Sequence, residues 1–131
     1  MPDKTRILMI EDETSAAFFM VILLTSAGCE VEVAAVPEKG IHLAKQGGFD
    51  LITLDVGLPG SNGFEIYRRL KEIPALRQTP IVFISGHCSL EDQQHGLDLG
   101  AADFITKPFE TWEFAPRLLS HVKTRQNCLN C

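Results

Sequence analysis

The sequence predicts an α/β protein in which a five-stranded parallel sheet lies between two layers of helices. Two observations carry this prediction: short apolar runs alternate with longer segments that have helical signals, and three of the five runs are apolar at nearly every position. Strands that are apolar throughout are typical of parallel sheets, because helices cover both faces of such a sheet. Strict alternation with right-handed crossovers gives a doubly wound arrangement.

The predicted strands are short and rich in β-branched or other apolar residues. The first, third and fourth are almost wholly apolar and are expected inside the sheet. The second and fifth each carry an acidic residue and are expected at its edges. The predicted strands cover residues 7–10, 31–34, 51–54, 81–84 and 102–105.

A predicted helix follows each of these strands. The predicted helices cover residues 14–27, 37–46, 63–72, 89–99 and 111–123. Side chains that can cap a helix N-terminus stand at Thr14, Ser89 and Thr111. Glycines stand where helices commonly stop, at Gly28, Gly47 and Gly100.

Length and composition favour one folded domain. The chain has 131 residues, of which 45% are hydrophobic and 22% are charged, and this balance supports a buried core. We expect one domain over residues 1–125, followed by a polar tail or linker stub over residues 126–131. The formal net charge of -5, without a basic cluster, argues against direct binding to nucleic acid.

The longest apolar run and the cysteines bear on location. The run 16–24 is far shorter than the roughly 20 residues that span a bilayer, and acidic residues precede it, so neither membrane insertion nor a signal peptide is expected. The four cysteines are too unevenly spaced for a disulfide framework, which favours a reducing, cytoplasmic location. Cys128 and Cys131 form a C-x-x-C that we interpret as tail thiols, and a redox or metal role stays open.

The residues that carry chemistry come close behind the strands. Glu11 and Asp12 follow the first strand, Asp55 the third, Ser85 the fourth and Lys107 the fifth. The carboxyl ends of the strands share one edge of a doubly wound sheet, and ligands bind there. Three crowded carboxylates repel one another and suit a hard divalent cation, for which Mg²⁺ is the natural choice. The ammonium and the hydroxyl complete a pocket suited to a phosphoryl dianion.

Four stretches of the chain hold these residues in a characteristic order, namely 7–13, 50–60, 62–63 and 100–109. Together they resemble the receiver domain of two-component response regulators, and the resemblance extends over nearly the whole chain. It implies a flavodoxin-like (βα)5 three-layer sandwich with strand order 2-1-3-4-5. It also implies a regulatory domain that catalyses only its own phosphorylation and dephosphorylation, rather than an enzyme in the usual sense.

The resemblance implies a role for each residue of the cluster. Asp55 is expected to be the nucleophile that accepts a phosphoryl group from a phosphohistidine and forms an acyl phosphate. Asp12 and Asp55 are expected to ligate Mg²⁺ directly, Glu11 through a metal-bound water, and the backbone carbonyl of Gly57 to supply a further oxygen. Lys107 is expected to pair with a phosphoryl oxygen. The donor is a sensor histidine kinase or a histidine phosphotransfer protein.

Two residues are expected to act as the switch. Ser85 is expected to hydrogen-bond the phosphoryl group and pull its loop inward, after which the Phe104 ring swings inward. These changes alter the surface of the fourth helix, fifth strand and fifth helix, which a downstream protein or output domain reads. By resemblance alone, the Lys107–Pro108 peptide bond is expected to be cis.

Some positions depart from the family pattern. Gly57 and Gly86 leave the pocket open, and His87 is close by, so Gly57 and His87 are candidates for tuning the lifetime of the acyl phosphate. The first helix is apolar around its whole circumference, and its Phe18 and Phe19 are candidates for a docking contact with the phosphodonor or for a homodimer. A tail or a neighbouring domain that covers this helix is the alternative.

Three other function classes fit less well. The strongest alternative is a pseudo-receiver that acts as an interaction module without phosphorylation, although such modules typically lack part of the set that is complete here. A haloacid-dehalogenase-type phosphatase needs a second acid two residues after its nucleophile, where this chain has Gly57. A nucleotide-binding flavodoxin-like protein needs a phosphate-cradling loop after the first strand, where this chain has three acids over 11–13.

Overall fold

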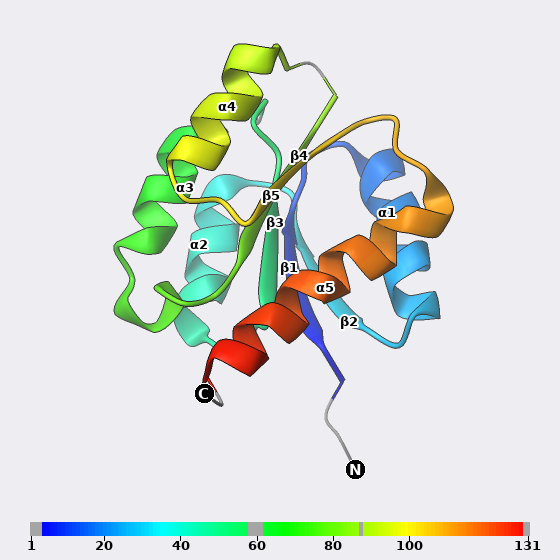
Figure 1. Cartoon of the computed structure of the whole chain (residues 1–131), viewed down its shortest axis with the longest axis horizontal. Helices are drawn as coiled ribbons and strands as arrows, with labels where there is room; N and C mark the ends of the chain where they lie inside the picture. Colours follow the sequence, from blue (N-terminus) through cyan, green and yellow to red (C-terminus); the bar gives the residue numbers. More distant parts are fainter. Residues whose placement is uncertain (1–3, 58–61, 87, 130–131) are drawn as a thin grey trace.

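A computed structural model describes residues 4–57, 62–86 and 88–129 and contains a five-stranded sheet flanked by helices on both faces (Figure 1). The strands are β1 Arg6–Ile10, β2 Glu30–Ala34, β3 Leu51–Leu54, β4 Ile81–Ser85 and β5 Asp103–Thr106. The α-helices are α1 Thr14–Ser26, α2 Pro37–Gln46, α3 Gly63–Lys71, α4 Leu90–Asp98 and α5 Thr111–Leu129. A 3₁₀ turn, Pro74–Leu76, precedes β4.

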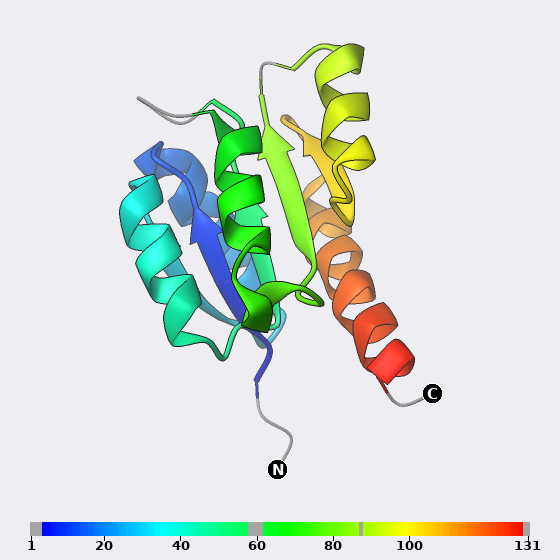
Figure 2. The same cartoon turned by 90° about the vertical axis from the view of Figure 1, so that its left-hand side faces the viewer.

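All the strands are parallel, and their order is β2-β1-β3-β4-β5. The predicted fold class and strand order are therefore confirmed, and so are the positions of the second and fifth strands at the edges. Figure 1 shows α1 and α5 on one face of the sheet and α2, α3 and α4 on the other, and in Figure 2 the arrows of β1 and β4 point the same way. Every strand thus ends at the same edge.

Side chains of the central strands alternate between two hydrophobic cores. Leu8 and Ile10 of β1 belong to the core that α2 and α3 cover, whereas Ile7 and Met9 belong to the core that α1 and α5 cover. This alternation follows from the two-residue period of a β-strand. Because both faces are buried, β1 and β3 have to be apolar at successive positions, as the sequence indicates.

Helix ends agree with the sequence at the glycines and differ at two of the three predicted caps. Gly28, Gly47 and Gly100 all have positive φ angles, of 91°, 79° and 111°, which glycine adopts without strain. Ser89 caps α4 and forms a reciprocal capping box with Asp92.

Thr14 and Thr111 are the first residues within their helices, so their predicted capping positions are wrong. The cap of α1 is Glu13, whose carboxylate accepts hydrogen bonds from the backbone N–H groups of Ser15 and Ala16 at 3.1 and 2.6 Å. A glutamate there satisfies two of the unpaired N–H groups of the first turn.

Helix α5 continues six residues beyond the predicted end at residue 123, to Leu129. The predicted polar tail is therefore helical as far as the structure describes it. Over 111–124, the part of the helix whose burial is described, Val122 is the last buried residue. The extra turns contain no glycine or proline that would stop them. Within the described ranges, no helix is both long and apolar enough to cross a membrane.

A cluster of charged groups ties α5 to β5. The Asp103 carboxylate accepts two hydrogen bonds of 2.7 Å from Arg117 and lies 3.0 Å from Nε2 of His121. Burial raises the pKa of the Asp103 carboxyl, but the hydrogen bonds from Arg117, His121 and the Phe104 N–H outweigh this effect and lower the pKa to about 2. Charge-assisted bidentate pairs of this kind are stronger than neutral hydrogen bonds.

The lowered pKa predicts how the stability of the domain depends on pH. The charged Asp103 stabilises the folded state fully at pH values above 3.8, the ordinary pKa of its carboxyl. This contribution is lost as the pH falls through about 2, its pKa in the folded protein. Asp103→Asn is expected to lower the free energy of unfolding by about 1 kcal/mol at pH 7. This is less than the pKa shift alone would give, because Arg117 is partly exposed and solvent screens its charge. Urea unfolding of both proteins at pH 7, 5 and 3 measures the difference, which should fall by about half between pH 5 and pH 3. A difference independent of pH would contradict this account.

Candidate functional site

The backbone ladder continues past the strand ends and sets the candidate residues side by side. The N–H of Glu11 donates to the carbonyl of Ala34 at 3.0 Å, and the N–H of Asp55 donates to the carbonyl of Ile10 at 3.2 Å. At the other side of the site, the N–H of Lys107 donates to the carbonyl of Ser85 at 3.0 Å. Residues from four strands therefore meet at one edge of the sheet, as the sequence predicts.

Three carboxylates gather at this edge. Oxygen atoms of Glu11, Asp12 and Asp55 all lie within 4.8 Å of one another. Glu11 is only 3% exposed, whereas Asp12 is exposed and Asp55 is partly buried. Burial raises the pKa of the Glu11 carboxyl, hydrogen bonds from Lys107 and Glu13 oppose the shift, and the charge of Asp55 adds to it. The cluster is thus an electrostatically costly arrangement that an additional cation would relieve.

Lys107 brings a positive charge to the carboxylates. Its Nζ donates to Oε1 of Glu11 at 2.6 Å and lies 3.8 Å from Oδ2 of Asp55. The other oxygen of Glu11 accepts a hydrogen bond from the N–H of Glu13 at 3.1 Å, and Oδ1 of Asp55 accepts one from the N–H of Gly57 at 3.0 Å. One ammonium therefore faces two carboxylates of a group of three.

These groups line a cleft of about 580 Å³. Asp55 and Lys107 are among its lining residues, together with Ser85, which is buried. Three carboxylates in reach of one another form the all-oxygen donor set that Mg²⁺ takes, so the residues present fit this metal. The ammonium and hydroxyl nearby could hold the oxygens of a phosphoryl group in the same cleft.

The other predicted site residues have different positions. Gly57 and Gly86 line the cleft, and a Cβ added to Gly86 would be in ordinary van der Waals contact, 3.8 Å from Cβ of Lys107. The effect of Gly57 on the lifetime of the acyl phosphate stays a prediction. His87 lies outside the described residues, and its role in tuning the rate stays a prediction. Cys128 falls within α5, and Cys131 lies outside the described residues.

Phe104 already lies inside the protein. Its side chain is 6% exposed, and its ring centroid is 5.6 Å from that of Phe83. Gly96 of α4 makes room for both rings, because a Cβ at this position would come within 3.0 Å of each. The Phe104 ring is therefore packed between β4 and α4. The switching role of Phe104 stays a prediction.

Two residues support the site without having been singled out from the sequence. Glu13 lines the cleft, and its N–H holds one oxygen of Glu11. Gly63 allows α3 to begin directly behind Asp55, because a Cβ there would lie 2.5 Å from the backbone oxygen of Asp55. Glu13 and Gly63 belong to stretches that the sequence analysis quotes. Their contacts with Glu11 and with the backbone of Asp55 could not be seen in the sequence.

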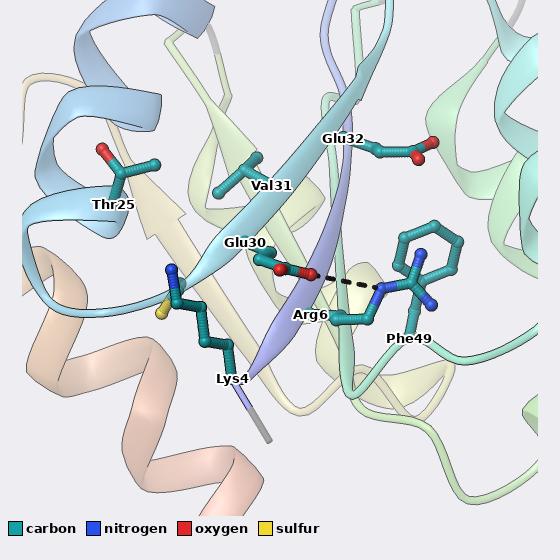
Figure 3. Close-up of a pocket in the computed structure, with 8 residues that line it drawn as sticks. Lys4, Arg6, Thr25, Glu30, Val31, Glu32 and Phe49 are labelled. Carbon is teal, nitrogen blue, oxygen red and sulfur yellow. Dashed lines mark ion pairs between the residues drawn. The ribbon is translucent and has the colours of Figure 1, made fainter. Parts of the chain in front are cut away.

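A second hollow of about 440 Å³ lies at the opposite edge of the sheet (Figure 3). Arg6 dominates it: the guanidinium is 4.7 Å from the centre of the Phe49 ring, 3.8 Å from Oε2 of Glu30 and donates to the carbonyl of Gly48 at 3.1 Å. Among the charged groups of this hollow, Arg6 and Glu30 pair with each other. The acidic cleft, which gathers three carboxylates and an ammonium, is the candidate functional site.

Comparisons with known proteins identify a family match. The response regulator receiver domain family matches residues 7–119. The transcriptional regulatory protein DltR of Streptococcus agalactiae is 39% identical over 124 residues, which cover 95% of this chain and 54% of that protein. This chain thus spans about half the length of the curated relatives it matches.

Solved structures show the same fold. The chemotaxis protein CheY4 of Vibrio cholerae is 30% identical with a TM-score of 0.82, and the match covers 92% of this chain and 99% of that one. A CheY-like receiver domain protein of Methanospirillum hungatei has a TM-score of 0.88 at 24% identity, over 95% of this chain and 98% of that one. With the family match over most of its length, the chain belongs to the response regulator receiver domains of two-component systems, which are regulatory domains.

Proposed function

We propose that this domain accepts a phosphoryl group on Asp55 from a phosphohistidine of a sensor histidine kinase or histidine phosphotransfer protein in the cytoplasm. The observation that carries the proposal is the placement of Asp55 in the cleft, with carboxylate oxygens of Glu11 and Asp12 within 4.8 Å and the Lys107 ammonium 3.8 Å away. A carboxylate held in this way is a nucleophile with groups nearby that can stabilise charge in the transition state.

Asp12 and Asp55 are the proposed direct ligands of Mg²⁺, with Glu11 acting through a water and the carbonyl of Gly57 as a further ligand. When bound, the metal supplies positive charge that offsets the negative charge of nucleophile and phosphoryl group. Glu11 holds the Lys107 ammonium through a 2.6 Å hydrogen bond, and that ammonium is positioned to pair with a phosphoryl oxygen. The Ser85 hydroxyl supplies a further donor from the floor of the cleft.

The transfer is a substitution at phosphorus. An Asp55 carboxylate oxygen forms a bond to phosphorus while the bond between phosphorus and the donor imidazole nitrogen breaks, and the imidazole keeps that electron pair. The product is an acyl phosphate on Asp55. Because such a transition state asks mainly for in-line positioning and charge stabilisation, a small domain can catalyse its own modification.

The output is proposed to pass through α4, β5 and α5 to an output domain or a separate protein. The relatives DltR and CtrA are a transcriptional regulatory protein and a cell cycle response regulator, each about twice as long as the matched region. We propose that the movement of Ser85 toward the phosphoryl group initiates the change and that the Phe104 ring, which packs against Phe83 beside Gly96 of α4, then moves inward.

Phosphorylation by a small donor tests the central proposal. Incubation with Mg²⁺ and acetyl phosphate is expected to add one phosphoryl group to the wild type, measured by intact mass, and none to Asp55→Asn, which lacks the nucleophilic oxygen. Omission of Mg²⁺ is expected to slow the wild-type reaction by about tenfold or more.

The pseudo-receiver hypothesis predicts the opposite result. A wild type that takes up no phosphoryl group and also fails to bind beryllofluoride would contradict phosphoacceptor function and favour an interaction module. If Asp55→Asn formed the adduct in the same yield as the wild type, Asp55 would not be the nucleophile.

The donor is proposed to dock on α1 beside the cleft. Phe18 is 67% exposed and Phe19 is half exposed, on a helix that begins next to the acidic cluster. An exposed apolar pair of this kind suits the side of a helix bundle that presents a phosphohistidine. A homodimer through the same face is a second candidate occupant, and a tail or a neighbouring domain that covers this helix is a third.

The measured quantity is the rate of phosphoryl transfer from a histidine phosphotransfer protein divided by the rate with acetyl phosphate. Phe18→Glu is expected to lower this ratio by about tenfold, because it places a charge in an apolar contact. Stopped-flow or gel-based transfer assays measure the ratio, and gel filtration of wild type and variant tests the homodimer. A wild-type ratio in the variant would contradict the docking role.

A further inference from the structure

The turn that carries Lys107 is held by a row of three aromatic rings. Phe109, two residues after the lysine, has its ring centroid 4.3 Å from that of Phe114 and 6.3 Å from that of Phe19. The two interplanar angles are 90° and 77°, the edge-to-face arrangement that aromatic pairs favour. Phe114 is buried in the core between the sheet and α5, whereas Phe19 comes from α1.

This row connects the turn after β5 to two helices, and Figure 1 shows the turn passing beside α1. One end of the row is anchored, since the Phe114 ring is buried among core side chains of the sheet. Phe19 forms the other end. A turn held from both sides has fewer accessible conformations than one held from α5 alone.

The same rings border the lysine side chain. A hollow of about 200 Å³ is lined by Phe19, Met20, Phe109, Ala16, Pro108 and Lys107 itself. Lys107 also lines the acidic cleft, into which its ammonium extends toward Glu11 and Asp55. The side chain thus has an apolar wall along one side and its charged end among carboxylates, as long basic side chains commonly do.

We propose that Phe19 is a positioning residue for Lys107. Phe19 braces Phe109, and the two rings limit the directions in which the lysine side chain can extend, so that the ammonium stays close to Asp55 when charge builds up on the phosphoryl oxygens. This inference rests on the proposed phosphoryl transfer to Asp55. It gives Phe19 an effect within the domain that is separate from contact with a protein donor.

Ile22 provides a matched control on the same helix. Ile22 and Phe19 are each 46% exposed, so truncation of either removes a comparably exposed apolar side chain from α1. Among the described residues, those that line the hollow beside Lys107 include Phe19 and not Ile22. An effect of α1 hydrophobicity in general would appear in both variants, whereas a positioning effect would appear in one.

The experiment uses acetyl phosphate, which requires no docking surface. Phe19→Ala is expected to lower the second-order rate constant of phosphorylation by about three- to tenfold, because the ammonium then samples unproductive positions. Phe19→Tyr, which keeps the ring, and Ile22→Ala are each expected to stay within about twofold of the wild type. Mg²⁺ affinity, measured by calorimetry without any phosphodonor, is expected to be unchanged in Phe19→Ala since the carboxylates are untouched.

A double-mutant cycle separates positioning from general disturbance of the fold. In a Lys107→Ala background the Phe19→Ala substitution is expected to change the rate by less than about 1.5-fold, because the group that it positions is gone. If Phe19→Ala does not fold, Phe109→Leu replaces it in the same cycle.

Several results would overturn the inference. One is a phosphorylation rate in Phe19→Ala equal to that of the wild type, and another is a loss of rate in Ile22→Ala as large as in Phe19→Ala. A third is a rate in Phe19→Tyr as low as in Phe19→Ala, and a fourth is a loss of Mg²⁺ affinity in Phe19→Ala. The last is the same loss of rate from Phe19→Ala in the Lys107→Ala background as in the wild type. A wild type that takes up no phosphoryl group would overturn the proposed function, and this inference with it. A phosphorylated wild type with an unaffected Phe19→Ala variant would overturn this inference alone.

Discussion

The structure depends on a concentration of negative charge at one edge of an apolar sheet. Glu11 is buried, and Asp12 and Asp55 lie close enough for one oxygen of each to contact a common ion. Taking a carboxylate out of water is costly unless it is paired and hydrogen-bonded. Glu11 satisfies both oxygens, one with the Lys107 ammonium and one with the N–H of Glu13.

The strand order makes this pairing possible. Glu11 follows β1, and Lys107 follows β5, with β3 and β4 between them in the sheet. The Asp55 carboxylate and the Ser85 hydroxyl follow those two intervening strands, so the long lysine side chain reaches across both to Glu11. Residues 96 positions apart in sequence are brought within 2.6 Å, and Asp55 lies in the space between their strands. The apolar interiors of both cores keep this edge rigid.

Much of this arrangement could be predicted from the sequence, because it depends on strong local patterns. Wholly apolar runs predict buried parallel strands, and the position of a residue directly after a strand predicts which edge it occupies. Helix ends were less accessible. Glu13 rather than Thr14 caps α1, and α5 continues to Leu129. The apolar pattern of a sequence does not mark helix ends of these two kinds.

Contacts that depend on how the helices pack against the sheet could not be predicted from the sequence. The packing of Phe104 depends on the space left by Gly96, and the wall beside Lys107 depends on Phe19 meeting Phe109. Each contact joins elements whose separation is set by the packing of the whole domain. The sequence presents Phe18 and Phe19 as two equivalent apolar rings. Their surroundings differ because the Phe19 ring packs edge-to-face against Phe109 in the turn after β5.

The central claim is that the carboxylates form a repelling cluster that a divalent cation relieves. Urea unfolding of wild type and Asp55→Asn, with and without Mg²⁺, tests it most directly. Without metal, Asp55→Asn is predicted to be more stable by about 1 kcal/mol, because one of three like charges is removed. Mg²⁺ is predicted to stabilise the wild type markedly and the variant much less. A variant that is less stable without metal, and that gains as much from Mg²⁺ as the wild type, would contradict the account.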